Sequence, residues 1–218
     1  MSFRSGGDGR LGVGSLGIGE DALAALVALV VLACRRARLT MVALPGGFDE
    51  NKVSVQVHQE LQMVQDRFNL RWLEFHLEGV INPPGRVPTK TVGRIDFKVK
   101  LRQHHGYPNA YFGVEGKRVS PGDTALARYY MRAGVGKFAA GTYSDGHPEA
   151  VLLGYLLAPP VTAVLDDIRR RLARLHGAAA TLRPWGPRYR DAQVVEGMVP
   201  RVRGGPIRLL HAIVRMHA

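Results

Sequence analysis

Two carboxylates and a lysine lie in a short, strongly apolar part of the chain and could form a divalent-metal site. Asp96 falls in the run GRIDFKVK (93–100), and Glu115 and Lys117 fall in the run AYFGVEGKRV (110–119). Aromatic and β-branched residues predict a strand for each run, and the polar stretch between them predicts a hairpin. Residues two apart in a strand point to one face, so Glu115 and Lys117 would lie side by side, with Asp96 near them. Mg²⁺ prefers such carboxylate oxygens, together with carbonyl oxygens and water.

The spacing of an acid and a lysine is weak evidence by itself, because it occurs three times, at 50–52, 96–98 and 115–117. Only the last pair lies in a strongly β-like run with an aspartate in the strand before it. The alternative is a surface strand with an ordinary ion pair, which contributes at most about 1 kcal/mol. Charged side chains are seldom placed in an apolar strand without a partner or a task, so we favour the metal site.

This arrangement resembles the PD-(D/E)XK, or restriction-endonuclease-like, nuclease superfamily, in which a strand with an aspartate is followed by a strand with Glu-x-Lys. Similarity to a group of uncharacterised bacterial nuclease-like proteins within it rests on four segments: RID (94–96), YFGVEGKR (111–118), a helix that ends near Lys137-Phe138, and Gly154-Tyr155. The resemblance covers about residues 48–157. The proline of the family motif is absent, because Ile95 precedes Asp96.

The resemblance implies an α/β fold with a restriction-endonuclease-like core, in which helices flank a mixed β-sheet. It also implies a Mg²⁺-dependent endonuclease, with Mn²⁺ as a substitute ion, that hydrolyses phosphodiester bonds, most often in DNA. The metal ligands that it implies are Asp96, Glu115 and the backbone carbonyl of Gly116. Lys117 would be the catalytic lysine that orients the attacking water.

A helix before the sheet often lends a glutamate to the metal site in this superfamily. Our candidate is Glu60, which falls in the helix predicted before the first strand. The alternative candidates are Glu74 and Glu78, which fall in the first predicted strand, at residues 70–81.

The charge of the chain favours a polyanionic partner. The formal net charge is +12, and between residues 168 and 218 eleven arginines stand against two acids. The planar fork of arginine suits phosphate oxygens, although a high-GC genome would also enrich arginine. The expected nucleic-acid contacts are Arg118, Arg128, Arg132, Lys137, Arg169, Arg170 and Arg174.

We expect one nuclease-like α/β domain over residues 20–218, with its core at about 48–175, after a loose Gly-rich segment at 1–19. Residues 22–34 form a run of about thirteen apolar residues, which predicts a buried helix because a membrane span needs about twenty. Acids precede this run and arginines follow it, the wrong order for an export signal. An alternative is that Met41 is the natural start. The single cysteine, Cys34, excludes an internal disulfide and favours a cytoplasmic location.

Periodicity and turn residues predict the remaining elements. The expected helices lie at 51–68, 123–139 and 161–175. The expected strands outside the central hairpin lie at 70–81, 151–157, 194–199 and 206–214.

Several functional questions stay open at this point. The main rival is a non-catalytic nucleic-acid-binding or scaffold protein with the same fold, and a second is a membrane-associated protein that uses residues 22–34. The residues do not separate DNA from RNA, single from double strands, or a monomer from a homodimer. A role in restriction or phage defence fits the resemblance alone.

Overall fold

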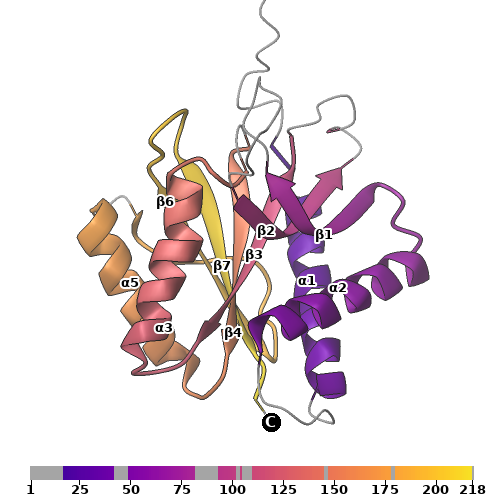
Figure 1. Ribbon diagram of the computed structural model, residues 1–218, viewed down its shortest axis with the longest axis horizontal. Coiled ribbons are helices and arrows are strands. Elements are labelled where there is room, and N and C mark those ends of the chain that lie inside the picture. The colour runs from indigo at the N-terminus through magenta and orange to yellow at the C-terminus, as the bar shows by residue number, and fades with distance from the viewer. Residues whose placement is uncertain are drawn as a thin grey trace, which may run out of the picture.

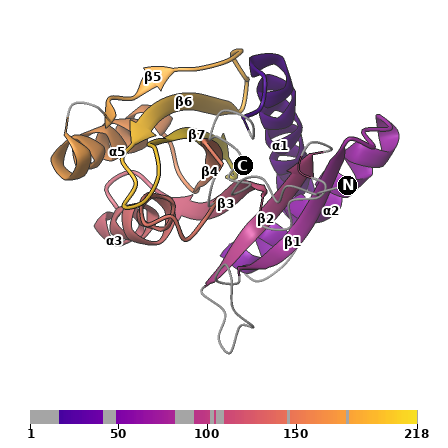
Figure 2. The ribbon, with the colours of Figure 1, turned by 90° about the horizontal axis from the view of Figure 1, so that it is seen from above.

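A seven-stranded mixed sheet forms the middle layer of the protein, and helices cover both of its faces (Figures 1 and 2). The structure is a computed structural model and describes residues 17–41, 49–81, 93–101, 104, 110–144, 147–177 and 180–217. Its helices are α1 (Glu20–Met41), α2 (Glu50–Arg67), α3 (Thr124–Tyr129), the π-helix η3 (Tyr130–Val135), α4 (Gly136–Ala139) and α5 (Val161–His176). Its strands are β1 (Leu73–Ile81), β2 (Gly93–Leu101), β3 (Phe112–Val119), β4 (Glu149–Leu156), β5 (Arg183–Pro184), β6 (Ala192–Val199) and β7 (Ile207–Arg215).

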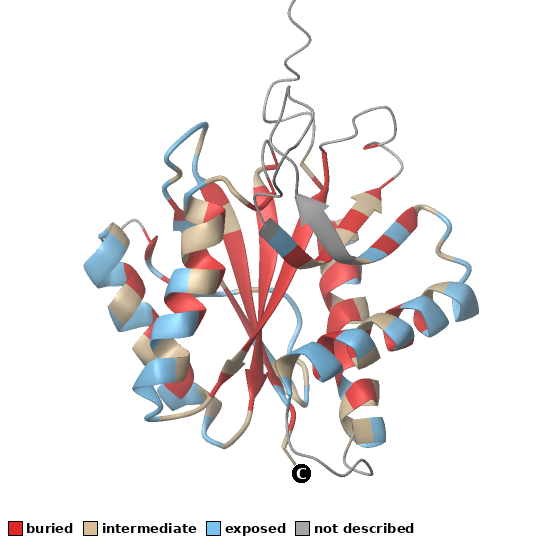
Figure 3. Ribbon diagram, in the orientation of Figure 1, coloured by how far each residue is buried: buried red, intermediate tan, exposed pale blue. Residues whose placement is uncertain are grey.

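The strand order across the sheet is β1-β2-β3-β4-β7-β6-β5. β1, β2 and β3 form an antiparallel meander, and β3, β4 and β7 run parallel to one another. β6 pairs antiparallel with β7, and β5 pairs antiparallel with β6. Every residue of β4 is buried, because helices cover both faces of the parallel centre (Figure 3). The expected α/β architecture, a mixed sheet flanked by helices, is therefore confirmed.

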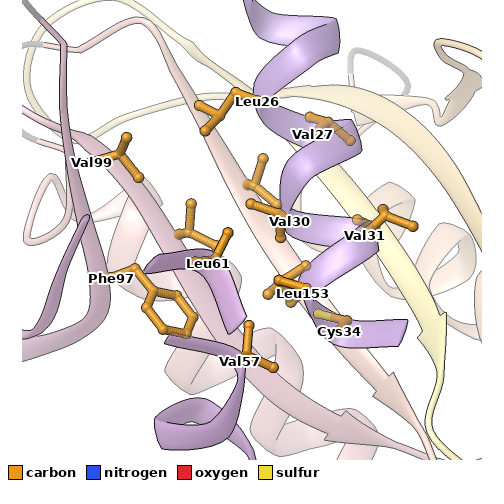
Figure 4. Packing of buried hydrophobic residues seen from close by; sticks show 14 of the residues in the cluster. Leu26, Val27, Val30, Val31, Cys34, Val57, Leu61, Phe97, Val99 and Leu153 are labelled. Atoms are coloured by element: carbon orange, nitrogen blue, oxygen red, sulfur yellow. The ribbon is translucent and has the colours of Figure 1, made fainter. Parts of the chain in front are cut away.

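Helices α1 and α2 cover one face of the sheet. Eight residues of α1 are buried, and Figure 4 shows Leu61 of α2 between Phe97 of β2 and Val30 of α1. The expectation of a buried apolar helix is confirmed, and the helix extends beyond the expected run in both directions. Within the described ranges, no helix is long and apolar enough to cross a membrane.

The opposite face is covered by α5 and by the continuous helical segment α3-η3-α4. Asp123 caps its start, because its carboxylate accepts hydrogen bonds from the backbone N–H groups of Ala125 and Leu126. The segment ends at Ala139 as expected, but its middle is a π-helix, which the sequence pattern did not indicate. A Cβ atom at Gly134 would lie 2.8 Å from Leu152 Cδ1, so glycine allows the π turn to approach β4 closely.

The C-terminal pair of strands is present, and β7 lies between β4 and β6 in the sheet. The chain beyond residue 175 therefore contributes to the centre of the fold. A fully buried polar pair joins β7 to the π-helix: Tyr130 Oη and His211 Nδ1 lie 2.9 Å apart. Burial lowers the pKa of His211 to about 4.

We expect this histidine to make the folded state less stable in mild acid. Between about pH 6.5 and 4 the unfolded chain binds a proton at His211 and the folded chain does not, so the free energy of unfolding falls as pH falls through this window, by roughly 3 kcal/mol. Urea unfolding at several pH values would measure the effect in the wild type and in His211→Asn, whose amide can still hydrogen-bond to Tyr130. Stability curves that run parallel for the two proteins would contradict the assignment.

Candidate functional site

Asp96 and Glu115 face each other where β2 and β3 separate. The two strands pair only from Phe97↔Val114 to Val99↔Phe112, and Asp96 and Glu115 are next in register. The backbone N–H of Asp96 donates to Glu115 Oε2 at 3.1 Å, and the N–H of Gly116 donates to Asp96 Oδ2 at 2.6 Å. Each carboxylate thus accepts from the partner strand's backbone, which holds the two side chains together.

Lys117 closes the site with three oxygen contacts. Its ammonium Nζ lies 2.8 Å from Glu115 Oε1, 2.7 Å from the carbonyl oxygen of Gly116 and 3.1 Å from Glu50 Oε1. The side chain of Lys117 is only 6% exposed, and its Nζ lies 5.5 Å from the ring centroid of Tyr129 on α3. Such a buried cation is strongly held by the acids around it.

Glu50, at the start of α2, is a site residue that sequence reasoning missed. Asp49 caps this helix by accepting from the Lys52 N–H, which fixes Glu50 in the first turn. Glu50 then reaches β3 with both oxygens: Oε1 contacts Lys117, and Oε2 accepts from the N–H of Arg118 at 3.1 Å. In the sequence, Glu50 stands out only as part of the acid-x-Lys spacing at residues 50–52.

The structure does not bring the expected helix glutamate, Glu60, to the site. Its Oε2 accepts from Arg36 Nε of α1 at 2.6 Å, and ten residues of helix, about 15 Å, separate it from Glu50. The rival Glu74 is exposed on β1 and pairs with His76. The side chain of Glu78 lies outside the described residues.

The pKa values of Glu115 and Lys117 are shifted because both side chains are buried close to other charged groups. Burial, and then the charge of Asp96, raise the pKa of Glu115 above its ordinary value, although Lys117 opposes this. Burial alone would lower the pKa of Lys117, but the carboxylates of Glu115, Asp96 and Glu50 outweigh it and raise that pKa above its ordinary value. Lys117 is therefore charged at neutral pH.

The predicted phosphate-binding residues lie on β3, on the helical segment α3-η3-α4 and on α5. Arg118 is beside the site, with Nε 3.9 Å from Glu50 Oε2. Arg128 and Arg132 are exposed on α3 and η3, and Lys137 is half-buried on α4. On α5, Arg169 pairs with Asp166 and Arg170 with Asp167, while Arg174 is exposed. The acids on α5 thus offset part of its positive charge.

Gly116 is required by close packing behind the site. A Cβ atom at this position would lie 2.6 Å from both Cε2 and Oη of Tyr155 on β4, whose ring is fully buried. Because the ring cannot move away without disturbing the core, only glycine fits between Glu115 and Lys117 here.

We expect Gly116→Ala to destabilise the fold by about 1–3 kcal/mol, the usual cost of overpacking a core. Gly205→Ala is the matched control, since its Cβ would meet nothing within 4 Å. Chemical unfolding of both variants measures the difference. Equal stability of Gly116→Ala and the wild type would show that β3 and β4 are not packed as described.

The donor atoms of the site suit a hard divalent cation. Oxygens of Glu115, Glu50 and Gly116 already converge on one cation, the ammonium of Lys117. Mg²⁺ is commonly bound through one or two carboxylates, with waters and substrate phosphates completing its shell. Over the described part of the chain, no group of three or more His, Cys, Asp or Glu side chains is placed to hold a metal ion. Asp96 and Glu115 are two carboxylates, which is the number that commonly binds Mg²⁺.

Comparisons with known proteins add no family to this geometry. No protein-family model matches the chain, and neither the curated proteins nor the solved structures contain a match.

Proposed function

We propose that this protein is a Mg²⁺-dependent nuclease that hydrolyses phosphodiester bonds, with DNA as the expected substrate. The observation that carries the proposal is that Glu115 and Glu50 contact the buried ammonium of Lys117, while Asp96 lies beside Glu115 and Gly116. Three carboxylates from α2, β2 and β3 lie close to one buried lysine, and such clusters of ionisable groups are typical of functional sites.

The arrangement of elements supports the same proposal. The order α2, β1, β2, β3, α3, β4, α5 is the core order of the restriction-endonuclease-like fold, which the sequence resembles. The acids lie on β2 and β3, and the lysine follows Glu115 by two residues. We propose that this part of the chain is such a core, and that α1 and β5–β7 extend it.

Asp96, Glu115 and the carbonyl of Gly116 would hold the ion, and Glu50 would position Lys117 beside it. When bound, Mg²⁺ would polarise the scissile phosphate and lower the pKa of a bound water. Lys117 keeps its proton at neutral pH, so its role is electrostatic: it orients the attacking water and offsets the negative charge that develops on the phosphate.

Positive side chains around the site would bind the nucleic-acid backbone. Arg118 lies beside Glu50, and Arg128 and Arg132 are exposed on the helical segment that follows β3. Such contacts give salt-sensitive affinity with little sequence preference. A cytoplasmic location and a role in restriction or phage defence would suit this activity.

A non-catalytic nucleic-acid-binding protein is the second candidate. The observation that favours it is that Lys117 itself fills the position where the oxygens of Glu50, Glu115 and Gly116 converge. In that case the acids and the lysine would be a buried ion network that only stabilises the sheet.

Metal-dependent cleavage separates the two. Purified protein would be incubated with plasmid, linear duplex, single-stranded DNA and RNA in Mg²⁺, Mn²⁺ or EDTA. We expect cleavage of at least one substrate with either ion and none with EDTA. Binding without cleavage under every condition would favour the non-catalytic protein.

A further inference from the structure

A cavity of about 740 Å³ lies at the edge of the sheet opposite β1, away from the candidate site. It is bounded by the start of α5, the ends of β4 and β7, and the segment 184–194, next to the β5–β6 edge seen in Figure 2. Its volume is typical of a small-ligand site. Neither Asp96, Glu115 nor Lys117 lines it.

The walls of this cavity combine aromatic rings with positive charge. Trp185 and Tyr189 supply the rings, and Arg188, Arg190 and Arg215 are exposed around them. Among the described residues that line the cavity, Asp191 is the one acid, and it is paired with Arg35 and Arg38 of α1. The arginines at the cavity therefore face little opposing charge.

Hydrogen bonds hold Trp185 in place on one side of the cavity. Its backbone N–H donates to the Val194 carbonyl at 3.2 Å, and its indole Nε1 donates to Glu20 Oε2 at 3.3 Å. The guanidinium of Arg208 lies 5.9 Å from the ring centroid. A rigid aromatic surface loses little entropy when a ligand stacks on it.

Tyr189 has unused hydrogen-bonding capacity. Its hydroxyl is buried and has no hydrogen-bond partner within the part of the chain that the structure describes. A buried hydroxyl without a partner is unfavourable, and a polar atom of a ligand could supply the missing hydrogen bond.

We propose that this cavity binds an unpaired nucleotide of a single-stranded nucleic acid. The base would stack on Trp185 and Tyr189, and Arg188 and Arg190 would contact the adjoining phosphates. Base–aromatic stacking with arginines along the backbone is the usual way of holding single strands, and it tolerates any sequence. The inference rests on the proposed nuclease function, because it names the form of that enzyme's substrate.

The position of the cavity relative to Lys117 suits this role. Paired residues form a row across the sheet, from Lys117 through Gly154 and Ile213 to Gln193, and the last two line the cavity. Neighbouring strands are about 4.8 Å apart, so the row spans about 14 Å. The cavity and the candidate site are thus only a few nucleotides of an extended single strand apart.

The first test uses the fluorescence of Trp185 in EDTA, where no cleavage occurs. The chain has two tryptophans, so Trp72→Phe leaves Trp185 as the sole emitter. We expect oligo-dT to change its emission in a saturable way, and a blunt duplex of equal length to leave it unchanged. No response to oligo-dT, an equal response to duplex, or an equal response to free dTMP at the same nucleotide concentration would overturn the proposal.

Variants test the same cavity through affinity. Trp185→Ala should weaken oligo-dT binding by about 5- to 150-fold. Because that change could also disturb the core, Arg188→Ala with Arg190→Ala is the second variant. It should reduce the salt dependence of log K by about 0.7 per lost contact on single strands. Arg203→Ala removes an exposed arginine that does not line the cavity and is the matched control. An effect of the control equal to that of the double variant would overturn the proposal.

The two proposals fail separately. Cleavage of nucleic acid without any response of Trp185 would overturn the cavity and leave the nuclease standing. A saturable response that is specific to single strands, in a protein that cuts nothing, would support the cavity as a binding site and remove the nuclease.

Discussion

The Asp96→Asn variant is expected to lose nucleic-acid cleavage by at least about a hundredfold, while its affinity for nucleic acid is unchanged or higher. The substitution removes one of the two charges that would hold Mg²⁺, and removing one group that stabilises a transition state typically costs a hundredfold or more. It also removes a negative charge that would face the phosphate, so binding should not weaken. Cleavage rates and binding in EDTA would be measured on the same substrate.

The fold should tolerate this change, which makes the variant informative. Asp96 Oδ2 accepts from the N–H of Gly116, and the amide oxygen of asparagine can accept the same bond. Asp66→Asn, at an exposed position near the end of α2, is the matched control and should cut like the wild type. If Asp96→Asn cuts as fast as this control, Asp96 holds no catalytic ion.

Lys117→Ala should also abolish cleavage but leave Mg²⁺ binding largely intact, since lysine does not ligate the ion. The structure adds a complication, because Lys117 lies between Glu115 and Glu50 and both of these side chains are mostly buried. Removing one partner of a buried ion pair costs about 3–5 kcal/mol, so this variant must be shown to be folded by circular dichroism. A folded Lys117→Ala that cuts normally would exclude the proposed role of the lysine.

Most of the fold could be predicted because each element carries its own pattern. The apolar residues of α1 cover every side of the helix, and that pattern predicts burial wherever the helix docks. The alternating and aromatic residues of β2 and β3 predict the strands, and the approach of Asp96 to Glu115 follows from their antiparallel register. Such local patterns predict the type of each element, and tertiary packing does not change that type here.

The missing part of the candidate site depends on how elements dock. The start of α2 was predicted within one residue, but the sequence does not give the angle at which the helix crosses the sheet. That angle decides that Glu50, in the first turn, reaches Lys117, while Glu60 meets Arg36 of another helix. The π-helix was missed for a similar reason: it depends on the contact between Gly134 and Leu152 of β4.

The choice between these two glutamates gives the second large expected effect. Glu50→Gln should reduce cleavage by about 10- to 100-fold and raise the Mg²⁺ concentration needed for half-maximal rate, as loss of a residue that supports a metal site commonly does. Its carboxylate contacts both Lys117 and the backbone of Arg118, so removing its charge weakens the hold on the lysine that the proposal assigns to the attacking water.

Glu60→Gln is the matched control, because it makes the same chemical change on the same helix. Glu60 binds Arg36, whose side chain is 40% exposed, so its neutral variant leaves no buried charge and should cut within about twofold of the wild type. Cleavage would be titrated with Mg²⁺ for both variants, with thermal unfolding measured in parallel. If Glu60→Gln loses activity while Glu50→Gln keeps it, α2 does not place its first turn at the reacting phosphate, and the site must be rebuilt around Glu60.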